Sequence, residues 1–170
     1  MSVLTFTPSG IYCPAGDFYI DPWRPVARAL ITHGHADHAR PGMGAYLATD
    51  MAAPVIRHRL GDIPLDTIAY GDMRQIGGPR VSFHPAGHVP GSAQIRVEAG
   101  GEVWVASGDY KVVDDGLSTP FEPVRCHHFI TESTFGLPVF RWQDQAVVAA
   151  QINAWWAACA GAGKTAFLGA

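Results

Sequence analysis

Four side chains of metal-binding type lie within the six residues 33–38. They are His33, His35, Asp37 and His38, and they follow the apolar segment Ala29–Thr32, which is predicted to be a strand. Residues i and i+2 at the end of a strand point to the same side, so His33 and His35 can bind one cation. Asp37 and His38 come after the turn and can face a second cation. Imidazole and carboxylate suit Zn²⁺, and also Mn²⁺ or iron, so this segment predicts a two-metal loop.

Length and composition predict a single globular domain around this loop. The chain has 170 residues, of which 48% are apolar, enough for one sizeable core but not for two large ones. No apolar run reaches the roughly 20 residues of a membrane helix, and the N-terminus does not resemble a signal peptide. Cys13, Cys126 and Cys159 are widely spaced and include no CxxC pair, which is typical of free thiols in a reducing compartment. We therefore expect a cytoplasmic protein with no membrane partner.

The charge of the chain gives no general attraction to nucleic acid. The formal net charge is −3, so a polyanionic substrate would have to be attracted by local arginines and by bound metal. Arg40, Arg57 and Arg59 follow the metal loop and are candidates for phosphate contacts, because guanidinium groups match phosphate oxygens. A solvated surface charge is the alternative for each of them.

Short apolar runs interrupted by Gly and Pro indicate many short strands. Gly100-Gly101 lies between two such runs and predicts a two-residue hairpin turn. Helices are predicted at Met51–Leu60, with Asp50 as the N-cap, and at Trp142–Gly161. Strands are predicted at Leu4–Thr7, Tyr12–Cys13, Phe18–Ile20, Ala29–Thr32, Ala45–Ala48, Ile68–Ala69, Arg74–Ile76, Val81–Pro85, Ala93–Ala99, Glu102–Ser107 and His128–Glu132.

The C-terminal part of the chain is strongly apolar. In the second predicted helix, Trp155 and Trp156 favour packing in a core over stacking on nucleobases. The run Thr165–Leu168 indicates the beginning of a further strand. Strands followed by helix–strand alternation predict an α/β arrangement with packed sheets. Because the chain ends at this apolar run, we expect it to be the N-terminal part of a longer protein.

The HGHADH segment of residues 33–38 resembles the HxHxDH signature of the metallo-β-lactamase superfamily. The resemblance implies an αββα sandwich, of which this chain is the N-terminal portion, and two divalent metal ions, Zn²⁺ or Mn²⁺. Asp21, directly after Phe18–Ile20, matches an acid that orients the metal ligands through hydrogen bonds.

Two further positions match ligands of that superfamily. His88, in the string AGHVPGSA, matches the third histidine of the first metal ion in preference to its competitor His84 on the preceding strand. Asp109, which follows the apolar run Val103–Ser107, matches the carboxylate that bridges both metal ions. The resemblance thus assigns His33, His35 and His88 to the first metal ion. It assigns Asp37, His38 and Asp109 to the second.

The string TESTFG at residues 131–136 is similar to a motif of the β-CASP branch, which acts on nucleic acids. Glu132 matches the acid of that branch that relays protons. Several other strings resemble the bacterial ligase-associated DNA damage response exonucleases, among them GDFYIDP at residues 16–22, HARPG at 38–42 and SGDYK at 107–111. This resemblance implies hydrolytic removal of nucleotides from DNA ends, with an ATP-dependent DNA ligase and a helicase as partners. Asp37, Asp109 and Glu132 would be catalytic, and Arg40 would bind substrate.

One feature departs from the β-CASP pattern, which has a late histidine ligand. No histidine follows Glu132, so the second metal ion is expected to be one ligand short and this segment alone to be inactive. Residues 1–140 are expected to form the metallo-β-lactamase part and residues 141–170 the start of the β-CASP region. The alternatives are an RNA-processing β-CASP ribonuclease, a hydrolase of a small ester or thioester on the same fold, and a binding module without catalysis.

Overall fold

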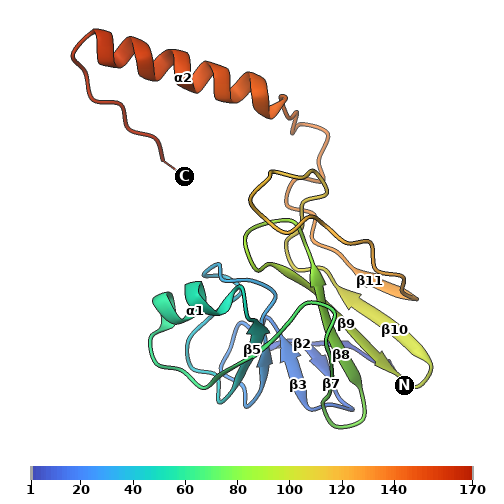
Figure 1. Ribbon diagram of the computed structural model, residues 1–170. Coiled ribbons are helices and arrows are strands. Elements are labelled where there is room, and N and C mark those ends of the chain that lie inside the picture. Colours follow the sequence, from blue (N-terminus) through green and yellow to red (C-terminus); the bar gives the residue numbers. More distant parts are fainter. Residues whose placement is uncertain (1, 170) are drawn as a thin grey trace. The chain divides into compact units, whose positions relative to one another are not determined.

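The computed structural model of the protein describes residues 2–169 (Figure 1). The chain divides into two compact units, Met1–Glu132 and Ser133–Ala170. Within the described residues, the first unit contains eleven strands and one helix, and the second contains one helix. Neither helix in residues 2–169 is long and apolar enough to cross a membrane.

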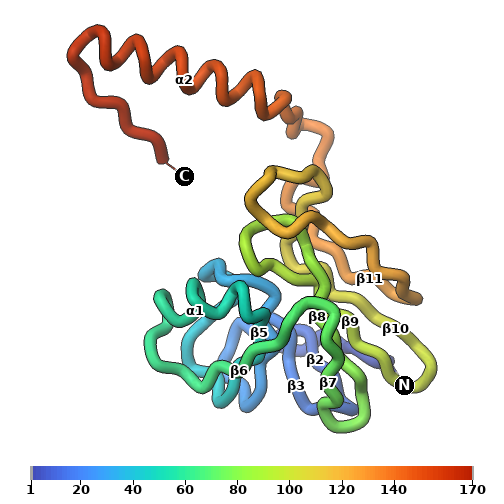
Figure 2. Tube along the Cα trace, in the orientation of Figure 1, coloured from blue at the N-terminus to red at the C-terminus, as the bar shows by residue number. Residues whose placement is uncertain are grey.

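The strands of the first unit form two sheets, each built from one continuous stretch of the chain (Figure 2). In the first sheet, β1, β2 and β3 are antiparallel, whereas β3, β4, β5 and β6 run parallel to one another. In the second sheet, β7 to β10 are antiparallel and β11 pairs with β10 in parallel. The first sheet contains β1 (Thr5–Thr7), β2 (Gly10–Cys13), β3 (Phe18–Ile20), β4 (Ala29–Leu30), β5 (Tyr46–Thr49) and β6 (Leu65–Ile68). The second contains β7 (Met73–Gln75), β8 (Arg80–Pro85), β9 (Ala93–Ala99), β10 (Glu102–Ala106) and β11 (His128–Ile130).

The main core lies between the two sheets. Phe18 and Ile20 of the first sheet share a buried cluster with Phe83 and Ile95 of the second. Full burial of each such side chain contributes roughly 1.5–3 kcal/mol, so this contact is a principal reason for the sheets to pack. The predicted combination of strands, few helices and two packed sheets is therefore confirmed. The Gly100-Gly101 turn is also confirmed, since both glycines have positive φ angles, 60° and 84°, between paired strands.

Helix α1 (Ala53–Leu60) covers the outer face of the first sheet, where Ala53 and Ile56 join a second buried cluster. The prediction that Asp50 is the N-cap of this helix is wrong. Its carboxylate accepts a hydrogen bond from the Met51 N–H (2.9 Å), and Ala52, which lies at the N-cap, makes no side-chain capping bond. Thr49, at the end of β5, instead accepts the Ala52 N–H through its Oγ1 (3.0 Å).

Helix α2 (Gln145–Gly161) ends at Gly161 as predicted but begins three residues later than the predicted Trp142. Its N-cap is Asp144, whose carboxylate accepts the Ala146 N–H at 2.7 Å. The expectation that its tryptophans pack in a core is wrong for the described residues: Trp155 and Trp156 are 44% and 60% exposed. The expected strand at Thr165–Leu168 is wrong as well. A strand needs a neighbour for its hydrogen bonds, and residues 133–169 contain no strand that could pair with it.

Candidate metal centre

The metal loop leaves the first sheet at the C-terminal ends of the parallel strands β3 and β4. Such strand ends are the usual position of ligand sites in parallel sheets. Asp21 follows β3 and Thr32 follows β4, and the two are joined by hydrogen bonds from the Thr32 N–H (2.8 Å) and hydroxyl (2.5 Å) to the Asp21 carboxylate. The side chain of Asp21, and not a neighbouring strand, therefore accepts the N–H of Thr32. Strand β4 ends at Leu30, two residues earlier than predicted.

Four of the predicted ligands converge. One ligand atom from each lies within 4.8 Å of the others: His33, His35, His88 and Asp109. His35 Nδ1 is 3.0 Å from His33 Nε2 and 3.3 Å from His88 Nε2. Asp109 Oδ2 is 3.9 Å from His33 Nε2 and 3.7 Å from His88 Nε2. Ligand atoms of a tetrahedral ion lie about 3.4 Å apart, because each metal–ligand bond is about 2.0–2.2 Å, so these residues fit a divalent cation.

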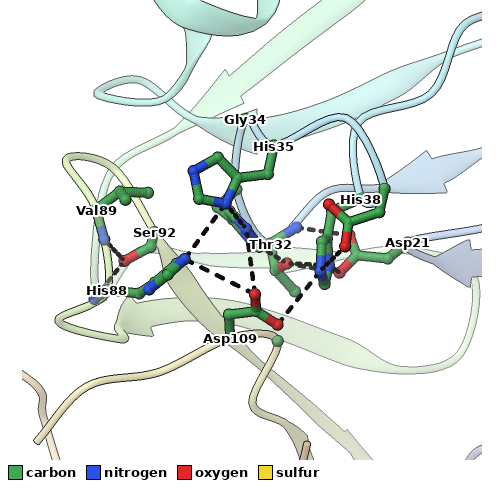
Figure 3. A network of polar contacts seen from close by, with 12 residues as sticks. Asp21, Thr32, Gly34, His35, His38, His88, Val89, Ser92 and Asp109 are labelled. Atoms are coloured by element: carbon green, nitrogen blue, oxygen red, sulfur yellow. Dashed lines mark hydrogen bonds and ion pairs between the residues drawn. The ribbon is translucent and has the colours of Figure 1, made fainter. Parts of the chain in front are cut away.

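Asp109 faces a second group of side chains with its other carboxylate oxygen. Asp109 Oδ1 lies 3.3 Å from His38 Nε2, and the same nitrogen lies 3.6 Å from Asp37 Oδ2. Figure 3 shows Asp109 between His35 and His88 on one side and His38 on the other. Asp37, His38 and Asp109 thus offer one atom each to a second position, and a single carboxylate reaches both positions.

Asp21 determines which nitrogen of His38 faces the centre. His38 Nδ1 lies 2.7 Å from Asp21 Oδ2, so Nδ1 donates to the carboxylate and Nε2 is left with its lone pair toward Asp109. Asp21 itself has a φ of 42°, an uncommon conformation for a residue with a Cβ. Such backbone strain is concentrated at functional sites, which agrees with the position of Asp21 beneath the metal loop.

The histidines differ in their affinity for protons. Burial lowers the pKa of His33 to about 2, with further lowering by the nearby His38, His35 and His88. Burial also lowers the pKa of His88, although Asp109 opposes this shift. Burial would lower the pKa of His38 too, but the hydrogen bond with Asp21 and the neighbouring carboxylates raise that pKa above its ordinary value. His33 is therefore kept neutral, the form that binds metal.

Helix α1 and the turn before it contact both ligand loops. Arg59 donates from Nη1 to the carbonyl oxygens of Gly34 (2.6 Å), between the first two histidines of the metal loop, and of Ala39 (3.3 Å), directly after its last histidine. Thr49 donates its hydroxyl to the Gly91 carbonyl (2.7 Å) in the loop that carries His88. A Cβ on Gly91 would lie 2.3 Å from the Ala52 backbone nitrogen, so only glycine permits this close packing.

A cavity of about 240 Å³ adjoins the Asp37–His38 side of the centre. Glu132 lies on its wall, together with Asp21, Asp37, His38 and Asp109. The cavity also has an apolar wall, formed by Ile11, Ile20, Trp23, Ala106 and Ile130. All of these residues belong to the first unit.

The side chains of three other candidates do not join the ligand cluster. Arg40 lies beside the loop, where its Nε donates to the Asp37 carbonyl (3.0 Å). Arg57 donates to the Leu65 carbonyl (3.1 Å), away from the ligands. His84 lies 3.0 Å from both the Ser82 hydroxyl and the Glu122 carboxylate and is not part of the ligand cluster. The sequence did not predict the contact of Thr32 with Asp21, the place of Trp23 beside the cavity, or the bonds from Arg59 to the metal loop. A threonine or tryptophan near a metal motif has no distinctive pattern, and the bonds of Arg59 join residues far apart in the sequence.

Comparisons with known proteins relate the chain to a segment of a longer protein. No family model matches. A protein named "Probable DNA ligase" from Opitutus terrae is 29% identical over 143 residues, which are 82% of this chain and 14% of that protein. A protein of unknown function from Enterococcus faecalis V583 has a TM-score of 0.45 at 14% identity, over 54% of this chain and 26% of its own. The E377D mutant of CmlA beta-hydroxylase has a TM-score of 0.40 at 19% identity, over 53% of this chain and 22% of its own.

Proposed function

We propose that this chain carries the metal centre of a metal-dependent nuclease that hydrolyses phosphodiester bonds in DNA. We assign it to the β-CASP branch of the metallo-β-lactamase superfamily, with residues 1–140 in the αββα sandwich and residues 141–170 at the start of the β-CASP region. The observation that carries the proposal is the carboxylate of Asp109, whose two oxygens face two separate groups of ligand atoms. Two-ion sites of this kind are used for in-line displacement at phosphorus.

The ligand sets divide between three histidines and a group richer in carboxylates. His33, His35 and His88 would hold one cation, Asp37 and His38 would hold another, and Asp109 would bind both. Zn²⁺ or Mn²⁺ ions bound there would offset charge on the phosphate oxygens and make a water molecule more acidic. Asp21 keeps the lone pair of His38 Nε2 directed at the centre through its contact with Nδ1.

Glu132 is the candidate for proton transfer. It lines the same cavity as Asp37 and Asp109, where it would meet a water molecule bound beside the cations. In the hydrolysis, the water oxygen forms a bond to phosphorus and the bond from phosphorus to the leaving sugar oxygen breaks. Glu132 would accept the proton of the water and return it to the leaving oxygen. Glu132 would therefore end the reaction in the protonation state in which it began.

The choice of substrate rests on observations outside the ligand geometry. The TESTFG string at residues 131–136 supports a nucleic acid. The strings that resemble the ligase-associated DNA exonucleases, and the relative whose name is "Probable DNA ligase", support DNA. A DNA ligase and a helicase are the proposed partners in repair. Overall charge does not favour a polyanion, so binding would depend on the bound cations and on Arg40 beside the loop.

A nuclease assay on the natural protein in its full length tests this function. We expect DNA cleavage with Mn²⁺ or Zn²⁺ and a loss of at least about 100-fold on Asp109→Ala, since removal of a bridging ligand disables both positions. Asp66→Ala is the matched control, because Asp66 is an exposed carboxylate paired with Arg74. Equal cleavage by wild type and Asp109→Ala, or cleavage of RNA or of a small ester with none on DNA, would contradict the proposal.

A further inference from the structure

The lining of the cavity beside the metal centre combines two kinds of residue. Asp37, Asp109 and Glu132 carry carboxylates. The apolar residues Ile11, Ile20, Trp23 and Ile130 line the same cavity. No lysine or arginine is among its lining residues, so the apolar ones suit an uncharged group and not a phosphate.

Trp23 is the aromatic residue of that wall, and its indole is both accessible and held in place. The residue is 46% exposed. Its Nε1–H donates to the Pro8 carbonyl (2.8 Å), and its backbone N–H donates to the Ser9 carbonyl (3.1 Å). An exposed indole whose polar edge already has a partner offers its ring face to a ligand at little cost in side-chain entropy.

The position of Trp23 is coupled to the metal loop through a short turn. Asp21, two residues earlier, binds Thr32 and His38 of that loop. Pro22 between them is buried against Gly10, where a Cβ would lie 3.1 Å from the Pro22 Cα. The same turn therefore fixes the histidine orientation and the place of the indole, and a ligand at the centre has the ring beside it.

We propose that Trp23 is a stacking platform for a nucleobase of the DNA strand whose phosphate lies at the metal centre. This inference rests on the proposed nuclease function and names a subsite within it. A nucleobase is flat, uncharged and apolar on its faces, which matches the indole and isoleucine wall. Its phosphate, one sugar away, is excluded from that wall and drawn to the cations. Because every base has such a face, the subsite would select single-stranded ends over intact duplex with little sequence preference.

A fluorescent base at the strand end tests the stacking directly. Single-stranded oligodeoxynucleotides carrying 2-aminopurine at the 5′ or the 3′ end are rapidly mixed with the metal-loaded natural protein, and fluorescence is read before cleavage. We expect quenching for one of the two ends, because stacking on an aromatic ring quenches this base. Trp23→Ala should abolish the quenching and weaken binding about 5- to 100-fold, whereas Trp23→Phe should retain most of both.

Two controls separate stacking from general damage. Trp104→Ala removes an indole that stacks on His128 at 4.2 Å and is not on the cavity wall, so it should leave the quenching unchanged. An oligonucleotide with an abasic end should bind wild type and Trp23→Ala equally. Circular dichroism and metal content should be the same for all variants.

The outcomes distinguish this inference from the proposed function. If wild type cleaves DNA and Trp23→Ala quenches 2-aminopurine as strongly as wild type does, the stacking platform is wrong and the nuclease stands. If quenching depends on Trp23 but no DNA is cleaved, the subsite stands and the proposed reaction is wrong. Equal weakening by Trp104→Ala would also overturn the role of Trp23.

Discussion

At the scale of single residues, Asp21 contacts the metal loop at two points, Thr32 and His38. Its carboxylate accepts the backbone N–H and the hydroxyl of Thr32, and it holds His38 Nδ1 at 2.7 Å. A resemblance predicts that Asp21 orients the metal ligands, and from the contact with Nδ1 we expect it to do so by fixing the tautomer of His38. The nitrogen of His38 that faces Asp109 is free of a proton only while the other nitrogen donates to Asp21.

Asp21→Asn tests this tautomer. The amide of asparagine can donate to His38 Nδ1, and the proton would then move to Nε2, where it blocks a metal ion. We expect the affinity of the Asp37–His38 side for Zn²⁺ to fall about 10- to 100-fold, measured by competition with a chelator. Asp17→Asn is the control: Asp17 also has a positive φ, 49°, but bonds to the Tyr12 hydroxyl. Equal losses in both variants, or no loss in Asp21→Asn, would exclude the tautomer mechanism.

The histidines also predict an order of protonation in the metal-free protein. The pKa of His33 is lowered to about 2, so its ring stays neutral as the pH falls. The pKa of His38 is raised, so its ring gains a proton at a higher pH than an ordinary histidine does. Since a protonated imidazole cannot bind metal, acid should release metal from the His38 side first. Ring-nitrogen NMR on the metal-free protein checks the order. Titration of His33 near its ordinary pKa would contradict it.

At the scale of secondary-structure elements, helix α1 contacts one ligand loop and the end of strand β5 contacts the other. Arg59 bonds to the backbone of the metal loop, 25 residues earlier in the chain. Thr49, in the strand before the helix, bonds to Gly91 in the loop of His88. The backbone of each ligand loop is therefore held by a side chain from an element next to it in the fold.

Arg59→Met tests the hydrogen bonds between helix α1 and the metal loop. The methionine keeps much of the side-chain volume but loses the bonds to Gly34 and Ala39, so the loop gains freedom and the affinity for the first metal ion should fall about 10-fold. Arg57→Met is a matched control on the same helix, because Arg57 bonds to Leu65 and not to the loop. Metal titration by calorimetry measures both. A loss of affinity in Arg57→Met as large as in Arg59→Met would mean that the helix is merely destabilised.

Elements were predicted well where their signal is local. Gly and Pro bound the strands, and Phe18–Ile20 and Ala93–Ala99 lie where the sequence analysis placed them. Asp50 failed as a cap because Thr49, one residue earlier, competes for the same backbone groups and its hydroxyl is buried against Gly91. The role of Arg59 could not be predicted, since it depends on a contact between residues far apart in the sequence. Four of the predicted ligand residues, His33, His35, His88 and Asp109, lie together, and strand-end spacing and a resemblance had selected them without a fold.

At the scale of the whole molecule, the two units differ in how they are stabilised. The first unit has buried clusters on both faces of its first sheet. In the second unit, the apolar helix α2 has no buried residue among those described. The sequence identified this helix from its composition, but burial depends on a partner surface that composition does not specify. Because all ligand residues belong to the first unit, metal binding should stabilise that unit alone.

Chelation should therefore lower the thermal stability of the first unit and leave α2 unchanged. Without cations, the ring of His38 is surrounded by the carboxylates of Asp21, Asp37 and Asp109, which repel one another. An ion that binds only the folded state stabilises that state by mass action. At a free Zn²⁺ concentration about 1,000 times the dissociation constant, the gain is about 4 kcal/mol. Scanning calorimetry with Zn²⁺ and with EDTA measures the difference, and hydrogen exchange assigns it to residues 2–132. In Asp109→Ala the Zn²⁺-dependent gain should largely disappear. If Zn²⁺ raises the unfolding temperature of Asp109→Ala as much as that of wild type, the ion is bound elsewhere and the centre described here does not hold it.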